Sequence, residues 1–179
     1  MKMQTSQRRH SSGIALPIVL LISSMLLVTA AAWFEAALAG ARATRNLGGR
    51  VQAFHSADSA LLRCARIALE SLPEPRNITG ALGREPEKWR LKASFEGAAA
   101  NAITPFATWP HAAKPPQCLI ETWPASSEND GDAFLITARG FGRRAETEVW
   151  LQQQLEIAES GPIAHWRRVV AKPFQTNAP

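Results

Sequence analysis

The sequence predicts an α+β protein in which a long N-terminal helix packs on a C-terminal antiparallel sheet of three or four strands. Three observations lead to this fold class. No charged residue occurs from Ile14 to Phe34, apolar residues then recur every three or four positions as far as Leu72, and apolar and polar residues alternate after Cys118. We expect a leader at 1–13, the helix at 14–72, a connector at 73–117 and the sheet domain at 118–179.

The apolar run at 14–34 has the length of a membrane span. About 20 residues at ~1.5 Å each cross the ~30 Å hydrocarbon core of a bilayer. Lys2, Arg8 and Arg9 precede the run, and no acid occurs among the first 34 residues. Because positive charge stays on the cytoplasmic side, we expect a single pass with the N-terminus in the cytoplasm and the rest of the chain outside. In a bacterium this places the span in the inner membrane, in contact with its lipid, and the C-terminal domain in the periplasm.

Three interpretations of this run compete. A plain single-span anchor is the one that the segment favours when taken alone. A cleaved secretory signal is the second, with the small residues Ala30, Ala31 and Ala32 as the cleavage site. The third is a leader that ends at Gly13 and is cut there, so that the apolar run from Ile14 is retained in the mature chain.

The second part of the helix shows one apolar face, made of residues three or four apart. It consists of Leu47, Val51, Phe54, Ala57, Leu61, Ala65, Ala68 and Leu72. We expect the face formed by Leu47, Val51, Phe54, Leu61, Ala65, Ala68 and Leu72 to pack on the sheet. Pro73 and Pro75 end the helix.

The connector at 73–117 is rich in proline and glycine. Within it, residues 85–95 are expected to hold a short helix or strand, with Trp89, Leu91 and Phe95 at apolar positions.

Strands are expected at 118–123, 133–139, 147–157 and 163–171, with a turn at 140–144 and a loose tail at 173–179. In the third of these, Val149, Leu151, Leu155 and Ile157 share one face, which predicts a sheet with one face packed under a helix. Arg167, Arg168 and Lys172 would discourage pairing at the last, edge strand.

The composition limits the classes of function. The 20 basic and 15 acidic residues give a net charge of +5, but three of the basic residues and no acid lie in the first 13 positions. The remainder therefore carries only +2, which argues against nucleic acid as the main ligand. Cys64 and Cys118 both fall on the expected outer side, where we expect a disulfide in preference to two free thiols.

No catalytic pattern is present in the sequence. The four histidines are scattered, and there is no nucleophile triad, phosphate loop or cluster with metal-ligand spacing. The acidic residues Glu128, Asp130 and Asp132 lack the full pattern of a calcium loop, so a solvated turn is favoured. We expect a protein that is not an enzyme and holds no cofactor or metal.

The order of these features resembles the PilX family of type IV pilus minor pilins. The resemblance rests on the basic leader ending at Gly13, the apolar run, Glu35, and the segments 39–46 (AGARATRN), 53–61 (AFHSADSAL) and 134–142 (FLITARGFG). It covers residues 8–71 best and 118–157 fairly. It implies a pilin-like fold, cleavage after Gly13 by prepilin peptidase, and N-methylation of Ile14.

The resemblance also implies partners. The mature subunit would join other minor pilins in a complex that primes assembly of the major pilin and caps the fibre, with a larger adhesin-like protein. The fifth mature residue of most pilins is Glu, whereas this chain has Ile18. That difference argues against a repeating shaft subunit, because the acid is thought to pair with the N-terminal amine of a neighbour.

Two alternatives remain open at this point. A minor pseudopilin of a type II secretion system would share the same architecture. A periplasmic binding module released after Ala32 would instead lose the apolar run.

Overall fold

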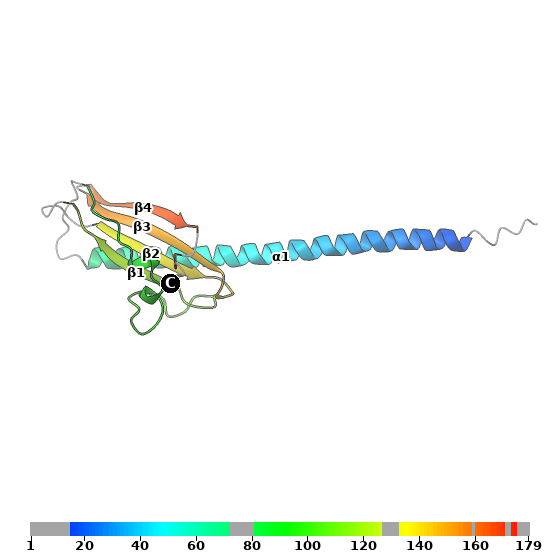
Figure 1. Ribbon diagram of the computed structural model, residues 1–179, viewed down its shortest axis with the longest axis horizontal. Coiled ribbons are helices and arrows are strands. Elements are labelled where there is room, and N and C mark those ends of the chain that lie inside the picture. The colour runs from blue at the N-terminus through cyan, green and yellow to red at the C-terminus, as the bar shows by residue number, and fades with distance from the viewer. Residues whose placement is uncertain (1–14, 72–80, 127–132, 159, 171–172, 175–179) are drawn as a thin grey trace, which may run out of the picture. The chain divides into compact units, whose positions relative to one another are not determined.

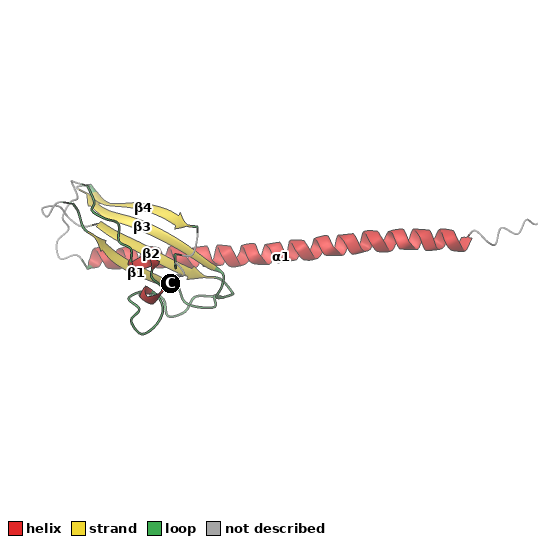
Figure 2. Ribbon diagram, in the orientation of Figure 1, coloured by secondary structure: helices red, strands yellow, loops and turns green. Residues whose placement is uncertain are grey.

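The computed structural model describes residues 15–71, 81–126, 133–158, 160–170 and 173–174. The chain divides into two compact units, Met1–Asn46 and Leu47–Pro179. Helix α1 (Ala15–Glu70) contributes residues to both units. One long apolar helix followed by a four-stranded antiparallel sheet confirms the expected α+β class (Figures 1 and 2).

Helix α1 ends where the spacing of apolar residues ends. The backbone N–H of Ser71 donates to the carbonyls of Ile67 and Ala68, at 3.0 and 3.3 Å. The Ser71 hydroxyl donates to the same Ala68 carbonyl at 2.7 Å. These bonds satisfy carbonyl groups that the last turn of a helix leaves without intrahelical donors.

The sheet is a meander in which consecutive strands are neighbours. Its strands are β1 (Gln117–Trp123), β2 (Ala133–Phe141), β3 (Glu148–Ala158) and β4 (Gly161–Val169). They pair antiparallel in the order β1-β2-β3-β4, so β1 and β4 are the edges (Figure 1). At the β3–β4 connection Gly161 has φ of +113°, a conformation that costs glycine little because it has no Cβ.

Both faces of the sheet are packed, which corrects the expectation of one packed face. On one face the C-terminal part of α1 contributes alanines and Leu61 to a core with Ile136, Leu151 and Leu155. On the other face a second core joins Trp89, Phe95, Leu119, Leu135 and Trp150. Strand β2 is consequently buried along its whole length.

The connector supplies the cover for the second face. It forms two short 3-10 helices, η1 (Lys88–Arg90) and η2 (Lys92–Ser94), in place of one helix or strand. Trp89 and Phe95 point into the core, but Leu91 between them is exposed. Leu91 joins the two short helices in extended backbone and Phe95 follows the second one, so the three side chains do not share one helical or strand face.

Two expectations near the sheet are wrong. The turn expected at 140–144 begins later, because β2 continues through Phe141. The tail expected to be loose begins with packed residues, since Pro173 is buried and the Phe174 ring lies 5.1 Å from that of Trp150 and 6.0 Å from that of Phe95. Aromatic burial against the second core therefore holds this part of the tail on the sheet.

Candidate functional site

The apolar part of α1 is the first candidate. Among the described residues, α1 is the one helix that is long and apolar enough to cross a membrane, with a mean hydropathy of 2.3 over its most apolar window. Twelve large apolar side chains between Leu16 and Phe34 are exposed, and none of this window is buried within the chain. By length and composition the segment could form a single membrane span, a surface that lipid or another apolar helix would cover.

Two of the polar side chains in this segment, Ser24 and Thr29, are bonded inside the helix. The Ser24 hydroxyl donates to the Leu21 carbonyl at 2.8 Å, and the Thr29 hydroxyl contacts the carbonyls of Met25 and Leu26 at 3.0 and 2.9 Å. Such bonds to the preceding turn lower the cost of placing these two hydroxyls in an apolar environment. The predicted processing residues Gly13 and Ile14 lie outside the described residues.

A close contact between α1 and β2 organises the second unit. The residues of α1 that face the sheet are small: Gly49, Ala53, Ser56, Ala57 and Ala60 are buried. A Cβ added at Gly140 of β2 would lie 2.2 Å from the Ala53 carbonyl oxygen and 2.3 Å from the Ala57 nitrogen. At Gly142 it would lie 2.5 Å from the Gly49 oxygen. Glycine is required there because the two backbones approach too closely for any side chain.

The residues of α1 that face the sheet differ in part from the packing face that the sequence predicts. Leu47 and Val51 are 64% and 47% exposed, so the expectation that they pack on the sheet is wrong. Phe54 is partly buried at the margin of the core. The close approach selects the face with the smallest side chains, Gly49 and Ala53, which is nearly opposite Leu47 and Val51 on the helix.

Further along the helix the predicted residues lie in the core. Leu61, Ala65 and Ala68 are buried against the sheet. Leu72 lies outside the described residues.

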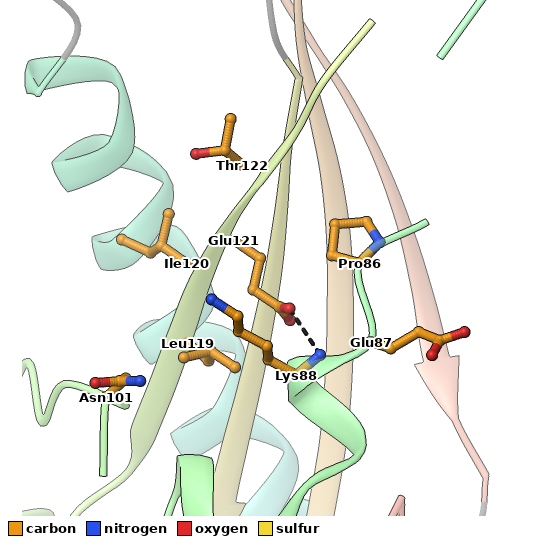
Figure 3. Close-up of a pocket in the computed structure, with 8 residues that line it drawn as sticks. All are labelled: Pro86, Glu87, Lys88, Asn101, Leu119, Ile120, Glu121 and Thr122. Carbon is orange, nitrogen blue, oxygen red and sulfur yellow. Dashed lines mark hydrogen bonds between the residues drawn. The ribbon is translucent and has the colours of Figure 1, made fainter. Parts of the chain in front are cut away.

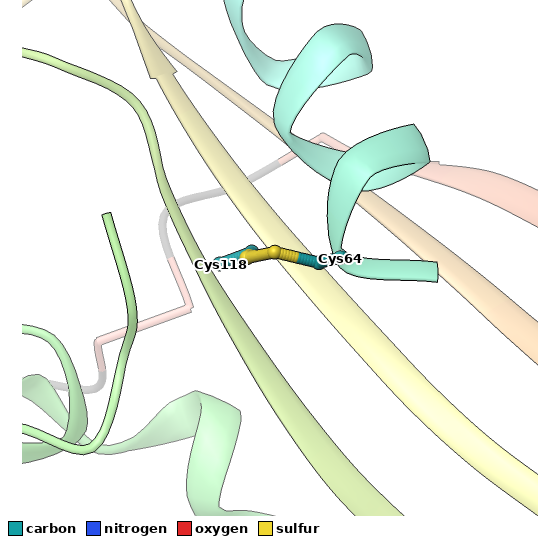
Figure 4. The surroundings of a disulfide bond; sticks show 2 residues. All are labelled: Cys64 and Cys118. Carbon is teal, nitrogen blue, oxygen red and sulfur yellow. A yellow bond between two sulfur atoms is a disulfide. The ribbon is translucent and has the colours of Figure 1, made fainter. Parts of the chain in front are cut away.

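The two cysteines join the helix to the first strand. Cys64 of α1 and Cys118 of β1 form a disulfide between fully buried side chains (Figure 4). They are separated by 54 positions in the sequence. Closing a loop of this length lowers the entropy of the unfolded chain and stabilises the fold by about 4 kcal/mol on the loop-entropy model.

A buried arginine was not expected from the sequence. Arg139 is 5% exposed on the second face of β2. Its Nη1 lies 2.8 Å from Glu96 Oε1, and its Nη2 and Nε lie 3.1 and 3.3 Å from the two carboxylate oxygens of Glu148. The guanidinium also lies over the rings of Phe141, Trp150 and Phe174, at 4.7, 5.2 and 5.4 Å from the centroids.

This cluster ties four segments together across the second core. The connector supplies Glu96, β2 supplies Arg139, β3 supplies Glu148 and Trp150, and the C-terminal segment supplies Phe174. A buried guanidinium is tolerated when its N–H groups donate hydrogen bonds and its acceptors are carboxylates of opposite charge. The one sequence signal for this cluster is Arg139 itself, the single charged residue in the apolar stretch 133–141. A cation in a buried strand requires acidic partners, but the sequence does not show which ones.

Two carboxyl groups on this side have shifted pKa values of opposite sign. The hydrogen bond from Arg139 holds the pKa of Glu96 below its ordinary value of 4.5. Burial raises the pKa of Glu121 above the same value, against the opposing effect of the N–H groups of Lys88 and Trp89. These N–H groups donate to the two Glu121 oxygens at 2.9 and 3.1 Å.

A cavity of about 430 Å³ lies beside Glu121, along the edge strand β1. Leu119, Ile120 and Thr122 line it from the strand, and Pro86, Lys88 and Asn101 line it from the connector (Figure 3). No group of three His, Cys, Asp or Glu that could hold a metal occurs in the part of the chain that the structure describes. Sequence reasoning missed this cavity because its walls are brought together from the least regular segment.

In comparisons with known proteins, no family model matched this chain, and neither the curated proteins nor the solved structures gave a match. The candidate site is therefore defined by its geometry. The first unit presents the exposed apolar helix, and the second unit separately presents the close contact of α1 with the sheet and the cavity on the edge of β1.

Proposed function

We propose that this chain is a membrane-anchored minor pilin that promotes the assembly of a type IV pilus. The observation that carries the proposal is the architecture of α1. An exposed, charge-free helical segment and a segment clamped to an antiparallel sheet belong to one uninterrupted helix. This arrangement supports a subunit that contributes an apolar helix to a fibre and presents a folded domain outside.

The apolar segment has a strong reason to stay out of water. Each large apolar side chain gains about 1.5–3 kcal/mol when it leaves water, and twelve of them are exposed between Leu16 and Phe34. In the proposed mechanism lipid covers this surface before assembly, and helices of other subunits cover it in the fibre. Packing, and no chemical reaction, is the role that we assign to the chain.

Ile18 supports a minor role in the fibre over a repeating one. If prepilin peptidase cuts after Gly13, Ile18 is the fifth mature residue and no carboxylate is available there to pair with the amine of a neighbour. An unpaired buried amine is costly, so a shaft built from many such subunits is disfavoured. The proposed partners are therefore other minor pilins, the major pilin that they prime and an adhesin-like protein at the tip.

The mature N-terminus tests the processing step. Mass spectrometry of the protein extracted from membranes should find a start at Ile14 with an added methyl group. A start near Trp33 would mean a released periplasmic module, and an intact Met1 would mean a plain anchor. Either of these results would refute the proposal.

Deletion of the gene tests the role in the fibre. Surface pili should be lost in the deletion strain, secretion of extracellular proteins should be unchanged, and the wild-type gene should restore the pili. The alternative, a minor pseudopilin of a type II secretion system, predicts the reverse: secretion is lost while pili remain.

A further inference from the structure

The outer edge of β1 is covered by the connector at two points only, among the residues that the structure describes. At one end, Cys118 and Ile103 exchange both backbone hydrogen bonds, at 2.8 and 2.9 Å. At the other end, Leu82 faces Ala125, and the Gly83 N–H donates to the Pro124 carbonyl at 2.9 Å. Between these two bridges the connector leaves the edge to cover the second core.

At this gap the backbone N–H and C=O groups of Ile120 and Thr122 lie in the plane of the sheet and point away from β2, toward the free edge. Hydrogen-bonding directions alternate along a strand, and Cys118 uses both of its groups on the outer side. The N–H and C=O of Ile120 and Thr122 therefore also face outward, while Leu119 and Glu121 bond to β2. No described residue forms a hydrogen bond to the four outward groups.

The gap coincides with the cavity beside Glu121. Ile120 and Thr122 form its wall on the strand, and the Lys88 side chain extends across it from the connector (Figure 3). The carboxylate of Glu121 is already occupied by two backbone N–H groups. The site thus offers two backbone donors, two backbone acceptors and one cation, Lys88, which acts on the nearby Glu121 at longer range but has no carboxylate within 4 Å among the described residues.

We propose that this gap binds an extended segment of another protein, which adds to β1 as a strand and places an acidic side chain against Lys88. Main-chain hydrogen bonds to Ile120 and Thr122 supply the affinity, and the ion pair with Lys88 supplies the preference for an acidic guest. The two bridges set the length of the guest, because they leave room for only a few residues between Ile103 and Leu82. The inference goes beyond the role in fibre assembly and does not depend on it.

The opposite edge of the sheet is less suited to this use. Strand β4 carries Pro162, Arg167 and Arg168, and proline and charged side chains discourage the pairing of edge strands. Arg167 is also engaged within the chain, with Gln152 and Glu85. The edge of β1 at Ile120–Thr122 carries neither a charge at its outward positions nor a proline.

Hydrogen exchange of the full-length chain in detergent micelles tests whether the edge is open. The amides of Leu119 and Glu121 should be protected by β2, and those of Ile120 and Thr122 should exchange at least about tenfold faster. Protection of all four amides in dilute protein would overturn the proposal, because the edge would then be covered by the chain itself. Protection that increases with protein concentration would also overturn it, since the guest would be a second copy.

Binding is tested with two capped pentapeptides, VTDTV and VTKTV, which are short enough to lie between the two bridges and differ only in the central charge. The acidic peptide should slow exchange of the Ile120 and Thr122 amides about tenfold at saturation and leave Leu119 and Glu121 unchanged. It should bind at least about fivefold more tightly than the basic peptide. No protection up to roughly 5 mM of either peptide, or preference for the basic one, would overturn the proposal.

Two pairs of matched variants test separately how the backbone hydrogen bonds at Thr122 and the charge of Lys88 contribute to peptide binding. Thr122→Pro removes one outward N–H but no bond to β2, and should weaken binding about tenfold, whereas Thr122→Val keeps the N–H and should bind as the wild type does. Lys88→Glu should reverse the preference between the two peptides, and Arg90→Glu, on the same short helix but outside the cavity, should not. Equal binding by Thr122→Pro and Thr122→Val, with both proteins folded, would refute recognition through the backbone. An unchanged preference in Lys88→Glu would refute the acidic guest.

Discussion

The contact between α1 and β2 makes Gly140→Ala the most informative single substitution. The added methyl would lie 2.2 Å from the Ala53 oxygen and 2.3 Å from the Ala57 nitrogen, both backbone atoms of a helix. Ordinary contacts of this kind begin near 3.4 Å, so the helix and the strand would have to separate by about 1 Å. The disulfide at Cys64 and Cys118 opposes such a movement further along the helix.

The cost follows from the packing that this separation would undo. A gap of 0.5–1 Å removes a quarter to a half of the dispersion energy of each contact across it, and overpacked cores lose about 1–3 kcal/mol or more. Because the obstacle here is backbone on both sides, we expect a loss of at least about 3 kcal/mol in the free energy of unfolding of the second unit.

The assay is denaturant unfolding of the full-length chain in micelles, followed by tryptophan fluorescence, since Trp89 and Trp150 are buried in this unit. Gly48→Ala is the matched control. Apart from the adjacent backbone of its own helix, no atom lies within 4 Å of its added methyl, and the change should stabilise the helix by about 1 kcal/mol. Adding Ala57→Gly to Gly140→Ala should not restore stability, because the clash is with backbone atoms. An unfolding midpoint for Gly140→Ala at or above that of the wild type would refute the close approach.

Further predictions concern the disulfide, the packing face, the buried arginine and pH. Replacing both Cys64 and Cys118 by Ala should lower the free energy of unfolding by about 4 kcal/mol, measured against the oxidised wild type; a loss below about 1 kcal/mol would contradict the loop-entropy estimate. Leu61→Asp should abolish the protease resistance of the second unit because Leu61 is 3% exposed, whereas Val51→Asp, at a half-exposed position, should change it little; equal sensitivity of the two variants would contradict the observed helix face. Arg139→Met should cost about 3–5 kcal/mol because it removes the buried cation that bonds the carboxylates of Glu96 and Glu148, and a stable variant would show that the aromatic packing alone suffices. The lowered pKa of Glu96 contributes stability above pH 4.5 that is lost as the pH falls through its folded-state pKa, so unfolding curves between pH 6 and 3 should show a decrease in the wild type that is smaller in Glu96→Gln. Glu121 has the opposite sign: its raised pKa makes stability fall as the pH rises through its folded-state pKa above 4.5, and a Glu121→Gln variant should lack that fall.

The sequence by itself determined the features that depend on neighbours along the chain. A charge-free run of helical length, a spacing of three and four as far as residue 72, and alternation after Cys118 predicted the helix, the four strands and their class of fold. Each of these patterns arises from the period of one element, 3.6 or 2 residues, and needs no knowledge of what the element packs against.

The tertiary structure alone decided which surfaces meet. Sequence periodicity favoured the face with Leu47 and Val51, yet Gly140 and Gly142 let the backbone of α1 approach β2 so closely that only the face with Gly49 and Ala53 fits. The irregular connector covers a second face of the sheet, brings Glu96 to Arg139, and leaves the edge of β1 open at Ile120 and Thr122. Contacts of this kind join residues from four segments, and no local pattern records them because they depend on how closely two backbones can approach.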